Sequence, residues 1–316
     1  MGLNIHDTPG IIKVNQKLSL DSGATITALC RVAVALSSGV RIWFSYTDGK
    51  VWHESGGTYT LVYTTAPAAG TAGGLGAAEY NSYLYWGTQS REHRIPVTNA
   101  TATAADWTAN VTLNWNIFSA TDAGFHPHIV QNQTLFIGDA NLVASVNSSA
   151  SFSPTALNLV APNRIKTMAP YDIDLVLGVF IASTVNMSWA VRWDTVQTTW
   201  QFNEPVRENG INAFFWLGNA LAAQAGRYGN VYFYDGQALQ PLNRIPGTWT
   251  DTQYGEVYPN AIANFRGVAV FGFSNGAGNP ADQGIYTMGR YSKNYPTVIN
   301  GPEYVISQND VTGVEI

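Results

Sequence analysis

Five residues in the first third of the chain combine flat aromatic rings with charged hydrogen-bonding groups. Arg41 and Trp43 lie in one apolar run, Trp52 and Glu54 lie in the next, and Trp86 lies in a third. Indole rings can stack on the apolar face of a sugar, and arginine and glutamate supply donors and acceptors for its hydroxyl groups. We therefore take these five residues as candidate carbohydrate-binding residues, whereas most other aromatic side chains are expected to fill the core.

Asp172 and Asp174 are the carboxylates with the best spacing for acid–base chemistry. Glycosidases place two carboxylates about 5 to 9 Å apart, one on each side of a bond. Two aspartates separated by one residue on a strand share a face and cannot flank a bond by themselves, so we expect them to cap a turn. The sequence contains no Gly-x-Ser-x-Gly, phosphate-binding or dinucleotide-binding motif. It therefore predicts no catalytic residues, no enzyme activity and no cofactor.

His126 and His128 could bind a metal, because residues two apart on a strand share a face. No third histidine, cysteine or carboxylate follows at a spacing typical of metal ligands, so we expect an ordinary pair at the start of a strand and no metal. Cys30 is the single cysteine, which excludes an internal disulfide, and its apolar surroundings predict a buried, unreactive thiol.

The charge and hydropathy of the chain exclude two classes of partner. Charged residues make up 12% of the sequence, against an average of about 25%, and the formal net charge is −5. The 16 lysines and arginines form no basic stripe, so we expect no direct nucleic-acid readout. No apolar stretch reaches the ~18 residues of a membrane helix, and the first residues lack the pattern of a secretory signal, so no membrane insertion is expected.

Strands must position these residues, because short apolar or aromatic runs alternate with turn residues along the chain. In residues 211–247, Gly218-Asn219, Arg227–Asn230 and Asp235-Gly236 separate four such runs. Asn, Asp and Gly tolerate the positive φ of hairpin turns, so this unit predicts a four-stranded antiparallel sheet. Comparable positions recur every 40 to 51 residues, at Ala28, Ala77, His128, Met168, Ala213 and Ala261.

Six such units predict an all-β fold, a β-propeller of six to seven four-stranded antiparallel blades. No stretch of ten residues has the 3.6-residue period of an amphipathic helix, so no helix is expected. A single propeller domain would cover residues 23–316, and residues 1–22 would form an N-terminal arm or clasp strand. A β-sandwich is the alternative architecture, which six matching units fit less well.

The two ends of the sequence decide how such a ring would close. Val311–Ile316 is similar to the first strand of a further unit, and Lys17–Leu20 could supply its outer strand as a clasp. Alternatively, both segments pair with a neighbouring chain, because exposed sheet edges recruit other strands. We expect six full blades and a composite or incomplete closing blade.

Two resemblances bear on function. Residues 40–54, VRIWFSYTDGKVWHE, resemble the repeat hairpin of fucose-binding propeller lectins, in which Arg, Glu and Trp line each pocket between blades; most other units here lack equivalents of Arg41 and Glu54. Residues 169–303, with segments such as YDIDLVLGVF, GNVYFYDG and YPNAIANFRGVAVFGFSNGAGNP, resemble a group of uncharacterised structural proteins of tailed phages and viral metagenomes.

The second resemblance implies a structural component of a phage virion, assembled in the host cytoplasm and located in the tail, the collar or on the capsid. Its partners would be other virion proteins and copies of itself, and it would act through assembly contacts. The alternative expectation is a carbohydrate-binding propeller, lectin-like or receptor-binding, with glycans as its partners.

Overall fold

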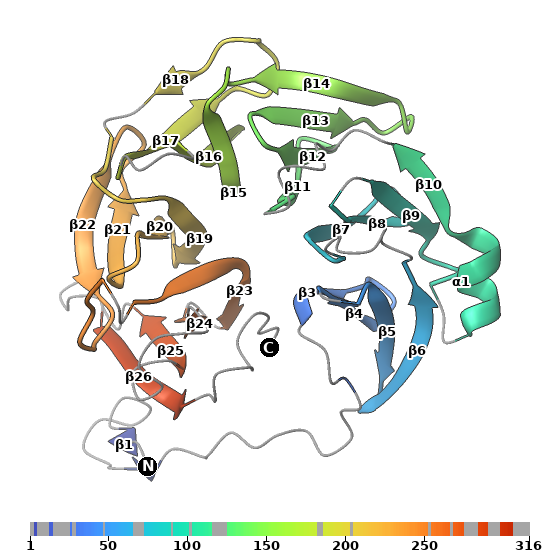
Figure 1. Ribbon diagram of the computed structural model, residues 1–316, viewed down its shortest axis with the longest axis horizontal. Helices are drawn as coiled ribbons and strands as arrows, with labels where there is room; N and C mark the ends of the chain where they lie inside the picture. The colour runs from blue at the N-terminus through green and yellow to red at the C-terminus, as the bar shows by residue number, and fades with distance from the viewer. Residues whose placement is uncertain are drawn as a thin grey trace.

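The protein consists mainly of β-strands. The structure is a computed structural model that describes residues 3–4, 13–14, 26, 30–46, 48–65, 73–89, 91–100, 103–115, 125–181, 186–202, 205–251, 254–265, 268–274, 284–289 and 298–305. Six antiparallel sheets of four strands each stand in a ring around a common centre (Figure 1). The all-β class expected from the sequence is confirmed. We number the sheets 1 to 6 in chain order.

Each sheet is a meander, because the order of its strands in space follows the chain. Sheet 1 contains β3 (Cys30–Ala35), β4 (Arg41–Ser45), β5 (Lys50–Ser55) and β6 (Thr58–Thr64), and sheet 2 contains β7 (Gly76–Tyr80), β8 (Tyr83–Gly87), β9 (Glu92–Pro96) and β10 (Thr112–Trp115). Sheet 3 contains β11 (His128–Gln131), β12 (Thr134–Asp139), β13 (Leu142–Val146) and β14 (Phe152–Asn158), and sheet 4 contains β15 (Asn163–Tyr171), β16 (Asp174–Ile181), β17 (Ser188–Trp193) and β18 (Gln201–Phe202). Sheet 5 contains β19 (Ile211–Leu217), β20 (Ala220–Ala225), β21 (Asn230–Tyr234) and β22 (Leu239–Arg244), and sheet 6 contains β23 (Glu256–Phe265), β24 (Val268–Ser274), β25 (Gly284–Gly289) and β26 (Val298–Val305).

The first strand of each sheet lies toward the centre of the ring and the last strand toward the outside (Figure 1). Neighbouring first strands contact one another from β3 through β7, β11, β15 and β19 to β23, and β23 in turn contacts β3. A small sheet pairs β1 (Leu3–Asn4) with β2 (Lys13–Val14). Lys17–Leu20 and Val311–Ile316, the expected clasp, lie outside the described residues.

Hairpin turns follow the residue preferences that the sequence indicates. Asn81-Ser82 join β7 to β8 and Asn132-Gln133 join β11 to β12, and all four residues have positive φ, from 48° to 65°. Positive φ at both central residues is the requirement of a two-residue hairpin turn that matches the strand twist. Gly218, at the turn expected between β19 and β20, has a φ of 62°.

The expectation of no helix is wrong. A short helix, α1 (Ala104–Asn110), lies between β9 and β10, and the Thr103 side chain caps it by accepting a hydrogen bond from the Asp106 amide. Its Trp107 is completely buried between sheets 1 and 2. The helix has seven residues, of which only Trp107 is buried, so it is too short to show the 3.6-residue apolar period over ten residues by which a helix would have been predicted. Among the described residues no helix is long and apolar enough to cross a membrane.

Buried apolar side chains fill the five boundaries from sheets 1 and 2 to sheets 5 and 6. Alternate residues of a strand point to opposite faces, so each sheet packs on both neighbours. On β16, for example, Leu175 and Leu177 pack toward sheet 3, whereas Val176 packs toward sheet 5. At the sixth boundary, between sheets 6 and 1, the part of the chain that the structure describes forms no comparable apolar cluster.

Candidate functional site

Four of the five predicted carbohydrate-binding residues come together on one face of sheet 1. Arg41 and Trp43 lie two apart on β4, and Trp52 and Glu54 lie two apart on β5. The strand register places Arg41 opposite Glu54 and Trp43 opposite Trp52. The other face of the same strands packs on sheet 2, so this group, which we call the sheet 1 cluster, faces the boundary with sheet 6.

The sheet 1 cluster combines a charged pair with aromatic rings. Arg41 Nε lies 2.6 Å from Glu54 Oε2 as an ion pair, without the geometry of a hydrogen bond, and Glu54 Oε1 accepts a hydrogen bond of 2.9 Å from the Gly57 amide. The Arg41 side chain is 51% exposed, whereas that of Glu54 is 2% exposed. Among the described residues, the buried indole N–H groups of Trp43 and Trp52 have no hydrogen-bond acceptor.

Trp86, the fifth predicted residue, lies elsewhere. It is fully buried in the apolar boundary between sheets 1 and 2, where its ring stacks on His93 at a centroid distance of 5.2 Å. Aromatic and other apolar residues occupy successive positions along β8, so the sequence does not show which face of sheet 2 carries Trp86. In the structure the indole packs into the core between sheets 1 and 2. Trp86 therefore lies on the opposite side of sheet 1 from the sheet 1 cluster.

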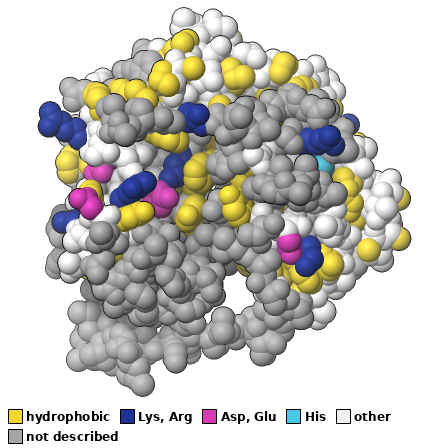
Figure 2. Space-filling view, viewed as in Figure 1, with side chains coloured by type: hydrophobic (Ala, Val, Ile, Leu, Met, Phe, Trp, Pro, Cys, Tyr) yellow, Lys and Arg dark blue, Asp and Glu magenta, His cyan; other side chains and the backbone are white. Residues whose placement is uncertain are grey.

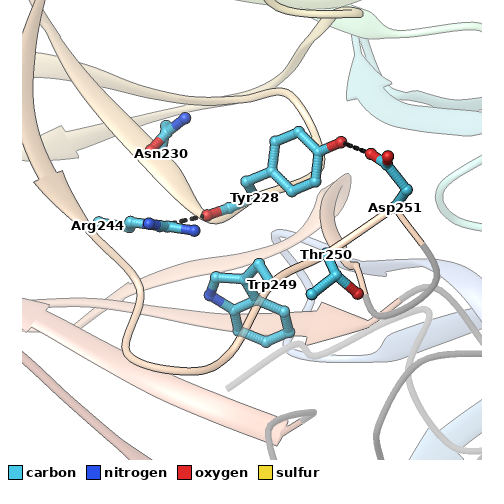
Figure 3. A pocket seen from close by; sticks show the side chains of 6 residues that line it. All are labelled: Tyr228, Asn230, Arg244, Trp249, Thr250 and Asp251. Atoms are coloured by element: carbon cyan, nitrogen blue, oxygen red, sulfur yellow. Dashed lines mark hydrogen bonds between the residues drawn. The ribbon is translucent and has the colours of Figure 1, made fainter.

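A second candidate site lies on sheet 5 and in the loop that follows it. It is an open cavity of about 480 Å³ (Figure 3), which we call the sheet 5 pocket, lined by Tyr228, Asn230, Arg244, Trp249, Thr250 and Asp251. Side chains of both charge signs gather over this side of the molecule, at the left of Figure 2. The sequence indicated residues 227–230 as a turn, and nothing in the spacing of residues 249–251 pointed to a site.

Hydrogen bonds hold the walls of the sheet 5 pocket in place. Arg244 Nε donates to the Tyr228 carbonyl over 2.9 Å, and the Tyr228 hydroxyl donates to Asp251. This hydrogen bond to the carboxylate raises the pKa of Tyr228. Trp249 Nε1 donates to the Ile245 carbonyl over 2.9 Å, so the indole is fixed at the floor of the pocket.

Two glycines allow the turn at the pocket to approach its neighbours. Gly226 and Gly229 have φ values of 70° and 75°, and a Cβ at Gly226 would lie 1.7 Å from the Glu208 carboxylate. Glu208 Oε1 accepts hydrogen bonds from Asn230 and from the Tyr232 hydroxyl. The turn is therefore held against a buried acid that also positions one wall of the pocket.

A buried polar network joins sheets 4, 5 and 6 near the centre of the ring. Lys166 Nζ donates to Asn212 Oδ1 over 2.7 Å and lies 2.6 Å from Glu256 Oε2. Asn212 donates to Gln224, and Gln224 accepts the Val257 amide. Because these buried groups are paired, the network has a structural role and offers no open position for a ligand.

His126 and His128 do not form an open metal site. His128 Nε2 lies 2.9 Å from Glu92 Oε1, and its Nδ1 lies 2.6 Å from the His126 carbonyl. Burial lowers the pKa of His126 to about 4 and raises the pKa of Glu92. Within the described residues, no three His, Cys, Asp or Glu side chains are grouped so that they could hold a metal ion.

The other residues with possible chemistry have local roles. Asp172 and Asp174 were expected two apart on one strand, with a role at a turn. Asp172 lies in the turn between β15 and β16 at a φ of 55°, which aspartate tolerates, so the shared strand is wrong and the position at a turn is found for Asp172. Asp174 begins β16 and lies 2.5 Å from Arg192 Nε. The Cys30 thiol stays protonated at neutral pH, because burial, with a smaller effect of Asp48, raises its pKa to about 12.

Comparisons with known proteins place the chain by its fold. No protein-family model and no curated protein matches its sequence. Solved structures do match. The extracellular domain described as that of a hybrid two-component system from B. thetaiotaomicron has a TM-score of 0.59 at 14% identity, over 94% of this chain and 36% of that chain. A streptogramin B lyase has a TM-score of 0.55 at 12% identity, over 78% of this chain and 77% of that one. YjhT has a TM-score of 0.54 at 8% identity, over 84% and 96% of the two chains.

These likenesses show the fold. The chain spans about a third of the length of the B. thetaiotaomicron protein, and all three identities are far below the level at which an activity can be transferred. One of the three neighbours is an enzyme by its description. Together with the ring of four-stranded sheets, the comparisons support a β-propeller-like fold of repeated sheets.

Proposed function

We propose that the protein is a carbohydrate-binding β-propeller whose sheet 1 cluster binds the ligand. The observation that carries the proposal is the grouping of Arg41, Trp43, Trp52 and Glu54 on one face. A buried N–H without a partner costs about 1–3 kcal/mol. Trp86 has such an N–H inside a closed apolar boundary, whereas Trp43 and Trp52 lie beside the exposed Arg41 guanidinium, where a ligand that brings hydroxyl oxygens can accept from both indoles. The charged pair supplies further donors and acceptors, and the resemblance of residues 40–54 to fucose-binding lectin repeats supports the same ligand class.

The proposal includes six blades. The contact between β23 and β3 supports a ring in which the sixth sheet follows directly on the first. The sheet 1 cluster then lies between blades, where a ligand can be held from two sides. No reaction is part of the proposal, since the lyase among the neighbours shares a fold at 12% identity and supplies no residues for a site here.

A glycan array tests the proposal. The wild-type protein should bind at least one neutral glycan, and Trp43→Phe or Trp52→Phe, which removes an indole N–H and keeps an aromatic ring, should weaken that binding. Trp216→Phe on sheet 5 is the matched control and should bind as the wild type does. A folded, concentrated protein that binds no glycan, or equal binding by all four proteins, would overturn the proposal.

The second candidate function is a structural component of a phage virion, favoured by the resemblance over residues 169–303. The two functions are compatible, because a virion component can also bind a receptor glycan. Mass spectrometry of purified particles tests this candidate. A protein abundant in the lysate and absent from the particles would contradict it.

A further inference from the structure

The sheet 5 pocket has a cationic end and an anionic end. In Figure 3, Arg244 and Asn230 lie on one side, Thr250 and Asp251 lie on the other, and the rings of Tyr228 and Trp249 lie between them. A site of this kind orients its ligand, because a negative group is attracted to one end and repelled from the other. The volume of about 480 Å³ falls within the ~300–1,000 Å³ of small-molecule sites.

Arg244 is prepared to bind an anion. Its Nε donates to the Tyr228 carbonyl, which fixes the guanidinium plane at the pocket wall. Its two terminal nitrogens make no hydrogen bond to any residue that the structure describes. Two parallel N–H groups on a fixed plane match the two oxygens of a carboxylate.

The remainder of the pocket suits hydroxyl groups on a ring. Asp251 accepts the Tyr228 hydroxyl through Oδ1, which leaves Oδ2 for a further donor. Asn230 uses its amide nitrogen for Glu208, which leaves its carbonyl oxygen as an acceptor. The rings of Tyr228 and Trp249 supply apolar surface between these polar groups, as the C–H face of a pyranose requires.

We infer that the sheet 5 pocket binds an acidic sugar, a pyranose unit with one carboxylate. The carboxylate pairs with the Arg244 guanidinium, and hydroxyl groups at the opposite side of the ring donate to Asp251. The inference concerns residues separate from the sheet 1 cluster, so it extends the proposed glycan binding to a second site with a different ligand.

Isothermal titration of the wild-type protein with three ligands tests the inference without any substitution. D-glucuronate should bind, whereas its methyl ester and D-glucose, which lack the negative charge, should bind at least roughly tenfold more weakly. Equal affinity for glucuronate and its methyl ester would overturn the role of Arg244. Absence of glucuronate binding at millimolar concentrations would overturn the site.

Substitutions locate the binding. Arg244→Gln should weaken glucuronate binding at least roughly tenfold, because a charge-assisted pair is lost. Arg227→Gln is the matched control: Arg227 is also exposed, but its guanidinium lies over the Tyr254 ring, 4.7 Å from the centroid, and glucuronate affinity should be unchanged. Equal losses in both variants would show attraction by general charge and would contradict the assignment.

The two proposed glycan sites can be tested separately, because each variant should affect only one of the two binding activities. Trp52→Phe should leave glucuronate affinity unchanged, and Arg244→Gln should leave binding to the neutral glycans of the array unchanged. Loss of both activities in either variant would show that they share one site, which would overturn the inference. Neutral-glycan binding without glucuronate binding would overturn the inference alone.

Discussion

The two faces of sheet 1 are built from the same strands and do different things. On one face, Ile42, Phe44 and Val51 are at most 1% exposed and join the apolar boundary with sheet 2. On the other face, Trp43 and Trp52 carry half-buried aromatic rings next to an ion pair, and their N–H groups have no acceptors in the part of the chain that the structure describes. The first face is covered by sheet 2, and the unpaired N–H of Trp86 in that boundary belongs to a fully buried ring, whereas the unpaired donors of the second face lie beside an exposed guanidinium.

A ring of similar sheets can hold a site at one position, because the boundaries between its sheets differ. Five boundaries are filled with buried apolar side chains, which stabilise the ring. The sixth boundary has direct contact between β23 and β3 but no apolar cluster among the described residues. The ion pair and the two indole N–H groups of the sheet 1 cluster face this boundary.

The largest effect is expected in the apolar boundary that the first face of sheet 1 forms with sheet 2. Trp86→Ala should lower the free energy of unfolding by about 3–5 kcal/mol, because it removes a large buried ring and leaves a cavity. Urea denaturation followed by far-UV circular dichroism measures the loss. Trp52→Ala, on the other face of sheet 1, is the matched variant and should cost less, because its ring is only half-buried. An equal or larger loss for Trp52→Ala would contradict the difference between the two sides of sheet 1.

Lowering the pH should destabilise the folded protein through two histidines that are buried at the boundaries of sheet 2. Burial lowers the pKa of His93, stacked on Trp86, to about 4, and the pKa of His126 is also lowered to about 4. The unfolded chain takes up these protons near pH 6.5, before the folded protein does, so stability should fall as the pH falls from about 6.5 to about 4. Glu92, whose pKa is raised, contributes in the opposite direction.

His93→Phe separates the contributions. This variant keeps a ring against Trp86 and removes one titrating group, so the loss of stability between pH 6.5 and pH 4 should shrink and the part due to His126 should remain. Urea midpoints of both proteins across this pH range provide the measurement. An unchanged slope would show that His93 does not titrate in the way its burial requires.

A smaller effect is expected from Glu54 on the polar face. Glu54→Ala leaves the Gly57 amide without its acceptor and Arg41 without its partner, so we expect a loss of about 1–3 kcal/mol in the free energy of unfolding. The same urea experiment applies. A neutral result would mean that Glu54 is not held in the buried position described, and the charged half of the sheet 1 cluster would have to be abandoned.

The sequence reveals some of these features and conceals others for physical reasons. Turn residues and alternating runs follow local rules, so the units and the hairpins could be predicted, and Arg41 and Glu54 could be chosen as candidate binding residues; their pairing is set by the strand register. The side of the sheet on which Trp86 lies depends on packing between sheets, which an aromatic run does not encode. The sheet 5 pocket joins a turn to Trp249 and Asp251 across a loop without periodicity, so no local pattern could find it.

The smallest effect is expected from Arg41, and it tests the asymmetry within the ion pair. The Arg41 side chain is half exposed, so water and salt screen its charge, and Arg41→Gln should cost no more than about 1 kcal/mol. Arg91→Gln is the control, because Arg91 is exposed in the turn before β9 and should change stability by less still. The difference between the two variants should diminish in 1 M salt, where screening acts over roughly 3 Å.

If Arg41→Gln costs as much as Glu54→Ala and salt has no effect, the pair behaves as a fully buried one. The exposed guanidinium would then not be available to a ligand, and the polar face of sheet 1 would be a second structural face.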